Sequence, residues 1–149
     1  SFTTNQNLIA FFSPASSALG GVLQNSGSSV TYATTSDIRL KSNITPTRYG
    51  LNELKQIEVK DYFYKNDDKT PQNGFIAQQL YKIYPFAVVP GGDDAKESPW
   101  MVDYGKITPL LVKSIQEQQE QMDDFKAQIE AQQKLIDELT KRLQALENK

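Results

Sequence analysis

Apolar residues recur at alternating spacings of four and three along the last third of the chain. This period is typical of a left-handed coiled coil, in which an apolar stripe packs against a partner helix. At ~1.5 Å per residue, the stripe between positions 111 and 146 is about 54 Å long. A single helix attached to its own globule would leave that stripe uncovered, so we expect self-association. The stripe consists of Leu111, Ile115, Gln118, Met122, Phe125, Ile129, Gln132, Ile136, Leu139, Leu143 and Leu146.

The stripe predicts an oligomer without specifying how many helices it contains. Isoleucine at the a positions with leucine at the d positions favours two helices, whereas Phe125 and two glutamines break that pattern. We expect Gln118 and Gln132 to fix the register by pairing with their equivalents in the partner helices, at some cost in stability.

Residues 37–106 contain the short mixed runs of a small α+β unit. Leu51, Leu54 and Ile57 give one apolar face of a short helix. Further along, the pattern predicts a strand over 59–64, a turn over 66–71, a strand or strand-to-helix corner over 75–77, a helix over 78–84, a loop over 90–94 and the approach to a strand over 99–102.

Residues 1–35 carry no charged side chain and are rich in Ser, Thr, Asn, Gly and Ala. Apolar runs over 8–12 and 30–32 predict strands separated by turns. The segment is either a flexible linker or the β-rich end of a fibre whose strands are completed by two sister chains. We favour the fibre, because it explains three bulky aromatic residues that would pack around a threefold axis: Phe2, Phe11 and Phe12.

The composition excludes several kinds of chemistry. The chain has no Cys and no His, which excludes a disulfide framework, a Cys nucleophile, a Ser-His-Asp triad and ordinary zinc sites. Its net charge of -2 does not favour nucleic acid or an anionic membrane as a partner. No apolar run approaches the ~20 residues of a membrane span, and no signal segment opens the chain.

The acidic residues of the α+β unit do not show the spacing of a known metal-binding motif. The pairs at 67–68 and 93–94 lack the alternating spacing of a calcium loop, and no P-loop is present, so we expect no metal and no cofactor. Asp103 is expected to be a cap or turn residue and Tyr104 a core residue, and neither is placed in the catalytic set.

Ser36 and Lys41 lie where the uncharged segment over 1–35 meets the α+β unit over 37–106. Serine–lysine pairs are an accepted variant of the nucleophile-plus-base arrangement. Lysine ordinarily titrates near ~10.4, so it acts as a base near neutral pH only when it is buried or has cations beside it. Arg39 would supply the cation, and Leu40 and Ile44 the apolar walls. On spacing alone, the segment also fits an ordinary turn or helix N-cap.

Several stretches together resemble a known family. They are GGVLQNSG at 20–27, VTYATTSDIRLKSNI at 30–44, GFIAQQ at 74–79, Tyr84-Pro85 with Val88, and VDYG at 102–105 continuing through PLL at 109–111. These stretches resemble the junction and following domain of phage tail-spike and tail-fibre proteins that end in an auto-cleaving intramolecular chaperone, the endosialidase or peptidase S74 type. The resemblance covers roughly residues 20–115.

This resemblance implies a homotrimeric chaperone that guides folding of the preceding fibre and then cuts itself away at a Ser-Asp junction. By position, Ser36 is the nucleophile, Lys41 the base and Ser36-Asp37 the junction. It implies bacteriophage assembly in the host cytoplasm, with the fibre going to the virion tail and the chaperone released. The expected partners are two further copies and the upstream fibre of the same polypeptide.

The expected domains are the fibre end over 1–36, the α+β chaperone core over 37–106 and the coiled-coil helix over 107–149. One alternative is a passive trimerisation or attachment module in which Ser36 and Lys41 are incidental. Another is a related membrane-anchored transcription factor of animals with a similar self-cleaving domain. The end of this sequence in the coiled coil, without a membrane span, counts against the transcription factor.

Overall fold

The computed structural model describes residues 6–12, 18–25 and 29–148, with side chains from residue 34 onward. The chain divides into two compact units, Ser1–Pro46 and Thr47–Lys149. The boundaries expected at 36 and 106 remain predictions. Phe2 lies outside the described residues, and so do the side chains of Phe11 and Phe12, so their packing around an axis also remains a prediction.

The first unit contains an antiparallel three-stranded sheet in the order β1-β2-β3. Its strands are β1 (Gln6–Phe12), β2 (Ala18–Asn25) and β3 (Ser29–Thr34). Strands at both predicted apolar runs are confirmed. Strand β2 was not predicted, because two adjacent glycines weaken a strand signal. β2 pairs with a strand on each side within the same chain, whereas the fibre interpretation expected sister chains to complete the strands.

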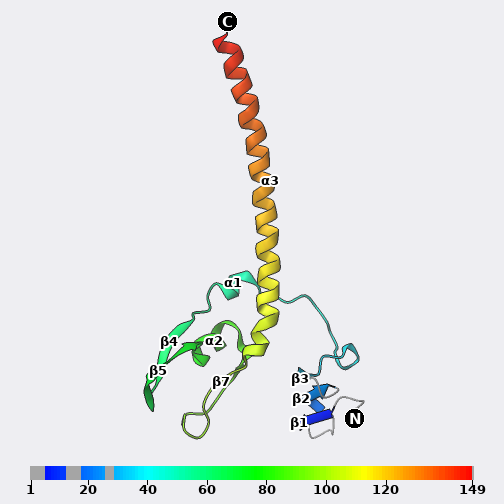
Figure 1. Cartoon of the computed structure of the whole chain (residues 1–149), viewed down its shortest axis with the longest axis vertical. Helices are drawn as coiled ribbons and strands as arrows, with labels where there is room; N and C mark the ends of the chain where they lie inside the picture. The colour runs from blue at the N-terminus through cyan, green and yellow to red at the C-terminus, as the bar shows by residue number, and fades with distance from the viewer. Residues whose placement is uncertain (1–5, 13–17, 26–28, 149) are drawn as a thin grey trace. The chain divides into compact units, whose positions relative to one another are not determined.

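The second unit is a small mixed α/β region followed by one long helix (Figure 1). Its elements are α1 (Leu51–Leu54), β4 (Lys60–Tyr64), β5 (Asp67–Gly74), α2 (Ala77–Ile83), η2 (Pro85–Ala87), β6 (Val88–Val89), β7 (Met101–Val102), η3 (Tyr104–Ile107) and α3 (Thr108–Glu147). The predicted helices near 51–57 and 78–84, the strand near 59–64, the corner at 75–77 and the strand after 99 are confirmed. The two-residue strand β6, which pairs with β7, was not predicted.

The turn predicted over 66–71 is wrong. Only Lys65 and Asn66 form the turn, and β5 begins at Asp67. The register shifts between Tyr62 and Tyr64, so Pro71 lies where regular pairing is interrupted. Proline is tolerated in a bulged edge strand because its missing N–H is not needed there.

The core of the second unit is small. Leu80 on α2 and Leu110 on α3 are each 2% exposed. The buried ring of Tyr84 belongs to this core and makes edge-to-face contacts with the rings of Tyr49 and Phe86, which also contact each other edge to face. The buried apolar side chains are Ala77, Leu80, Tyr84, Ala87, Val88, Ile107 and Leu110.

Helix α3 packs on the core with one side of its first turns and leaves the heptad stripe open. Leu110 and Ser114 are buried, whereas Ile115 and Ile129 on the stripe are 63% and 64% exposed. The 40-residue helix confirms the long helical segment that the heptad period predicted. From Ile115 onward the apolar positions of the stripe are about half exposed or more, whereas Leu111 at its start lines a pocket with Leu54 and Ile57.

A carboxylate on α3 connects the long helix to α1. Glu117 Oε2 accepts a hydrogen bond from the backbone N–H of Leu51 at 2.7 Å, and Lys113 lies 3.3 Å from Glu117 Oε1. Glu53 accepts from the N–H of Gly50 at 2.9 Å. Two otherwise unpaired N–H groups at the start of α1 are thereby satisfied, which matters because the first N–H groups of a helix have no partner within it.

Candidate functional site

A short 3-10 turn places Ser36 beside Lys41. The turn is η1 (Ile38–Leu40), and the Asp37 side chain caps it by accepting from the Arg39 N–H at 2.9 Å. The Lys41 N–H closes the turn on the Ile38 carbonyl at 3.0 Å. Because the backbone reverses here, the Lys41 side chain returns to the start of the turn. Its Nζ donates to Ser36 Oγ at 2.8 Å.

Asp37 is fully engaged by Arg39. Arg39 Nε donates to both carboxylate oxygens at 3.0 Å, and Nη2 donates to Oδ2. These side-chain hydrogen bonds, together with the one from the Arg39 backbone, hold the pKa of Asp37 below its usual range, and the nearby charge of Lys41 acts in the same direction. The Arg39 guanidinium is therefore paired with Asp37, and the expectation that it serves as the cation beside Lys41 remains a prediction.

The apolar walls expected around Lys41 are also absent from the described part of the single chain. Leu40 is 74% and Ile44 65% exposed, and Ser36 and Lys41 are exposed as well. The turn is too short to fold its apolar side chains over the lysine. Asn43, at φ 51°, then redirects the backbone in a left-handed conformation, which asparagine tolerates better than most residues.

Asp103 and Tyr104 lie in the second unit. Asp103 caps η3 by accepting from the Gly105 N–H at 3.0 Å, so the expected cap is confirmed. Tyr104 is 53% exposed, so its placement in the core was wrong. Its ring instead lies over Phe75, with centroids 5.3 Å apart.

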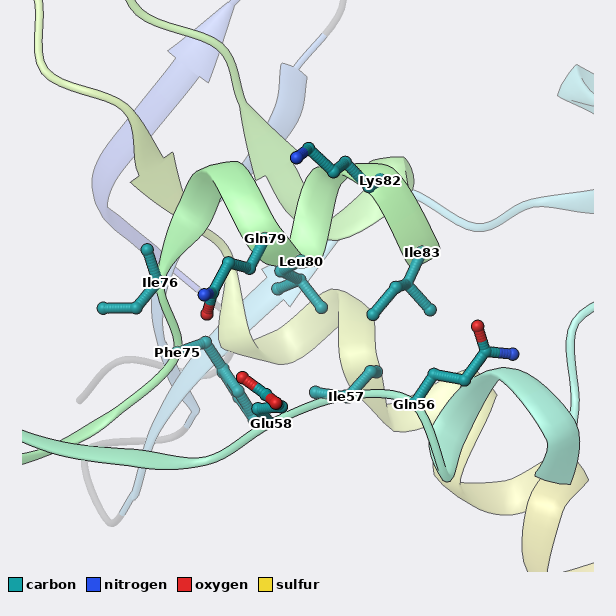
Figure 2. A pocket seen from close by; sticks show the side chains of 9 residues that line it. All are labelled: Gln56, Ile57, Glu58, Phe75, Ile76, Gln79, Leu80, Lys82 and Ile83. Atoms are coloured by element: carbon teal, nitrogen blue, oxygen red, sulfur yellow. The ribbon is translucent and has the colours of Figure 1, made fainter.

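The second unit has a pocket of about 230 Å³ between α2 and the segment that follows α1. Figure 2 shows Leu80 and Ile83 pointing from α2 toward Ile57, with Lys82 pointing away. The lining contains no serine, so this pocket does not hold a nucleophile-plus-base pair.

Among the described residues, no group of three or more His, Cys, Asp or Glu side chains could hold a metal ion. In the same residues, no helix is both long and apolar enough to cross a membrane.

Residues 36–89 match the family described as chaperone of endosialidase, Peptidase_S74. This stretch is therefore a Peptidase_S74 domain, a family whose name implies autoproteolytic activity. The match begins at Ser36 and contains the whole hydrogen-bonded turn through Lys41. No curated protein matches the chain.

The structure brings Ser36 and Lys41 together, and their catalytic roles remain predictions. Sequence reasoning missed the pairing of Asp37 with Arg39 and the link from Glu117 to Leu51. The first had a local signal, an acidic N-cap followed two residues later by arginine. The second joins residues 66 positions apart, a distance at which a single sequence carries no spacing signal.

Proposed function

We propose that this chain is the trimerisation chaperone of a phage tail fibre or spike. In this proposal it guides folding of the preceding segment and releases itself by autoproteolysis at the Ser36–Asp37 junction. The observation that carries the proposal is the 2.8 Å hydrogen bond between Lys41 Nζ and Ser36 Oγ, at the start of the Peptidase_S74 match. This is the separation that proton transfer from a serine to its base requires.

The open stripe of α3 supports the oligomeric part of the proposal. Its apolar positions remain about half exposed or more along the helix, and burying them against equivalent helices releases apolar surface from water. Three chains held in register by such a coil would keep the strands before Ser36 at high effective concentration. The three chains would then associate in register before the fibre folds.

Assembly also supplies a reason for the timing of cleavage. A lysine accepts the serine proton only as a neutral amine, and solvent favours the ammonium form. Ser36 and Lys41 are exposed in the single chain. Neighbouring copies that cover Ile38, Leu40 and Ile44 would exclude water from the amine, so cleavage would follow correct trimerisation. Loss of the chaperone would then trap the fibre kinetically.

The chemistry starts with transfer of the Ser36 Oγ proton to neutral Lys41. Attack of that oxygen on the carbonyl carbon before Ser36, through a five-membered ring, breaks the Thr35–Ser36 bond. Attack by the Ser36 oxygen of a neighbouring chain on the Ser36 carbonyl breaks the Ser36–Asp37 bond. In both cases the lysine ammonium returns the proton to the departing amine, and water hydrolyses the ester. The proposed junction requires the second route or a water activated by Lys41.

Intact-mass spectrometry of freshly expressed protein tests the proposal and identifies the bond. We expect two fragments from the native chain, and one intact chain from Ser36→Ala and from Lys41→Met. Lys55→Met, at an exposed lysine outside the turn, is the matched control and should cleave like the native protein. A native chain that stays intact as a stable trimer after long incubation would instead favour a passive trimerisation module.

A further inference from the structure

Residues 1–46 contain three charged side chains, and all of them lie in the candidate site. They are Asp37, Arg39 and Lys41. Asp37 is therefore the only carboxylate side chain of this unit that Lys41 can pair with, and Tyr32 in β3 is the remaining titratable side chain. A lysine base needs a serine partner and no carboxylate partner, because a bound carboxylate stabilises the ammonium form.

The geometry puts Lys41 and Asp37 in competition. Their charges are close enough for Lys41 to contribute to the lowered pKa of Asp37. Lys41 Nζ nevertheless bonds to Ser36 Oγ at 2.8 Å, and no hydrogen bond from it to the carboxylate occurs in the described structure. Arg39 occupies both oxygens of that carboxylate through Nε and Nη2, and its backbone N–H adds a further bond to Oδ1.

We infer that Arg39 is a positioning residue for the self-cleavage reaction, and that it keeps the Asp37 carboxylate away from Lys41. The inference rests on the proposed function of the Ser36–Lys41 pair. The planar guanidinium matches the two carboxylate oxygens, whereas an ammonium offers a compact point charge. Arg39 therefore binds the Asp37 carboxylate, and the Lys41 amine remains available to bond Ser36 Oγ. Asp37 also has a structural role, because its Oδ1 caps the turn η1 that brings Lys41 close to Ser36.

Three variants separate this role from a structural one. Arg39→Met frees the carboxylate to pair with Lys41. Asp37→Asn removes the charge and keeps a side-chain oxygen that caps a turn as well as aspartate does. The double variant has neither the guanidinium nor the competing charge. Arg48→Met, which removes an arginine that bonds to Tyr49 in the other unit, is the matched control for lost positive charge.

The first readout is the rate of self-cleavage between about pH 6 and pH 10. We expect Arg39→Met to cleave at least about tenfold more slowly near pH 7, with its pH–rate profile moved upward by about one unit, the lower limit for an opposite charge placed nearby. The double variant should return to within about threefold of Asp37→Asn alone. Unchanged kinetics in Arg39→Met, or slow cleavage that Asp37→Asn does not rescue, would overturn the inference.

The second readout does not depend on cleavage. In the uncleavable Ser36→Ala background, lysine side-chain NMR follows protonation of Lys41, with Lys41→Met identifying its signal. We expect Arg39→Met to raise the titration midpoint by about one unit and added Asp37→Asn to restore it. If the titration midpoint of Lys41 is the same with and without Arg39, the inference is wrong. A native chain that fails to cleave while this midpoint moves refutes the proposed function, and it leaves standing only that Arg39 keeps the Asp37 carboxylate away from Lys41.

Discussion

At the scale of single residues, the candidate site is made by one side-chain cap. Asp37 holds the 3-10 turn, and the turn brings Lys41 Nζ within 2.8 Å of Ser36 Oγ. Proximity of this kind needs only local backbone geometry, so it exists in the single chain. The pair is hydrogen bonded and still exposed in the single chain, and in the proposed function neighbouring copies would exclude water from the lysine.

Two adjacent glycines give the sharpest residue-scale prediction. A Cβ on Gly91 would overlap the backbone of Ser98 and lie 2.6 Å from Pro99 C and 2.7 Å from Trp100 N. Gly91→Ala must therefore move backbone, and we expect it to lose about 1–3 kcal/mol in the free energy of unfolding, a typical cost of overpacking. Urea denaturation with a two-state fit measures the loss.

Gly92→Ala is the matched control. A Cβ at this position would meet only the Ser98 side chain, at an ordinary 3.5 Å from its Cβ and 3.8 Å from its Oγ. Its effect should be close to zero or stabilising by about 0.4–1 kcal/mol, because alanine reduces the freedom of the unfolded chain. Equal stabilities for the two variants would mean that the close approach of the backbone at Gly91 is absent in solution.

At the scale of elements, the short helix α1 depends on α3 for one of its N-terminal hydrogen bonds, the bond from Leu51 to Glu117. The backbone bond from Leu51, assisted by Lys113, lowers the pKa of Glu117 from its ordinary value of 4.5. A carboxylate with a lowered folded-state pKa contributes stability above its unfolded pKa. That contribution is lost as the pH falls through the folded-state value. The attachment of α1 to the long helix should therefore weaken in acid.

We expect the melting temperature of the uncleavable Ser36→Ala protein to fall between about pH 6 and pH 3. The fall should be smaller in the same protein carrying Glu117→Gln, which starts less stable because its neutral amide bonds Leu51 less strongly. Differential scanning fluorimetry across this range measures both effects. Glu130→Gln, at an exposed carboxylate further along α3, is the control. If its pH profile matches that of Glu117→Gln, the link to Leu51 is unimportant.

At the scale of the whole molecule, the single chain has a small core and a long open stripe. The apolar positions of the stripe expose surface that, in the proposed function, other copies of the helix would cover in register. A charge at the centre of the stripe would be costly to bury, whereas the same charge outside it would stay in water. Self-association and self-cleavage are therefore expected to fail together.

Ile129→Asp tests this coupling. We expect the uncleavable Ser36→Ala protein to have about three times the chain mass of 16.8 kDa by light scattering, and Ile129→Asp to reduce that mass to one chain. In the cleavable background, Ile129→Asp should stop self-cleavage. Glu130→Gln again serves as the control on the polar face. Full cleavage by a monomeric Ile129→Asp protein would show that the single chain activates Lys41 without neighbours.

Much of the fold followed from local pattern. The heptad period predicted α3 because helical periodicity and burial concern residues only three and four positions apart. The β-branched and aromatic run predicted β4. Glycine signals misled at β2, because pairing with a strand on each side outweighed their low propensity. The proline signal misled at β5, because Pro71 lies where the pairing is interrupted.

The sequence by itself determined the long helix with its open stripe, the chemistry left after excluding His and Cys, and the serine and lysine that a family resemblance singled out. Only the tertiary structure decided that Leu40 and Ile44 stay in solvent and that Glu117 holds α1. The physical reason is that hydrogen-bond competition and exposure depend on where side chains meet in three dimensions. Spacing along a chain specifies those meetings only within a turn of helix or a short loop.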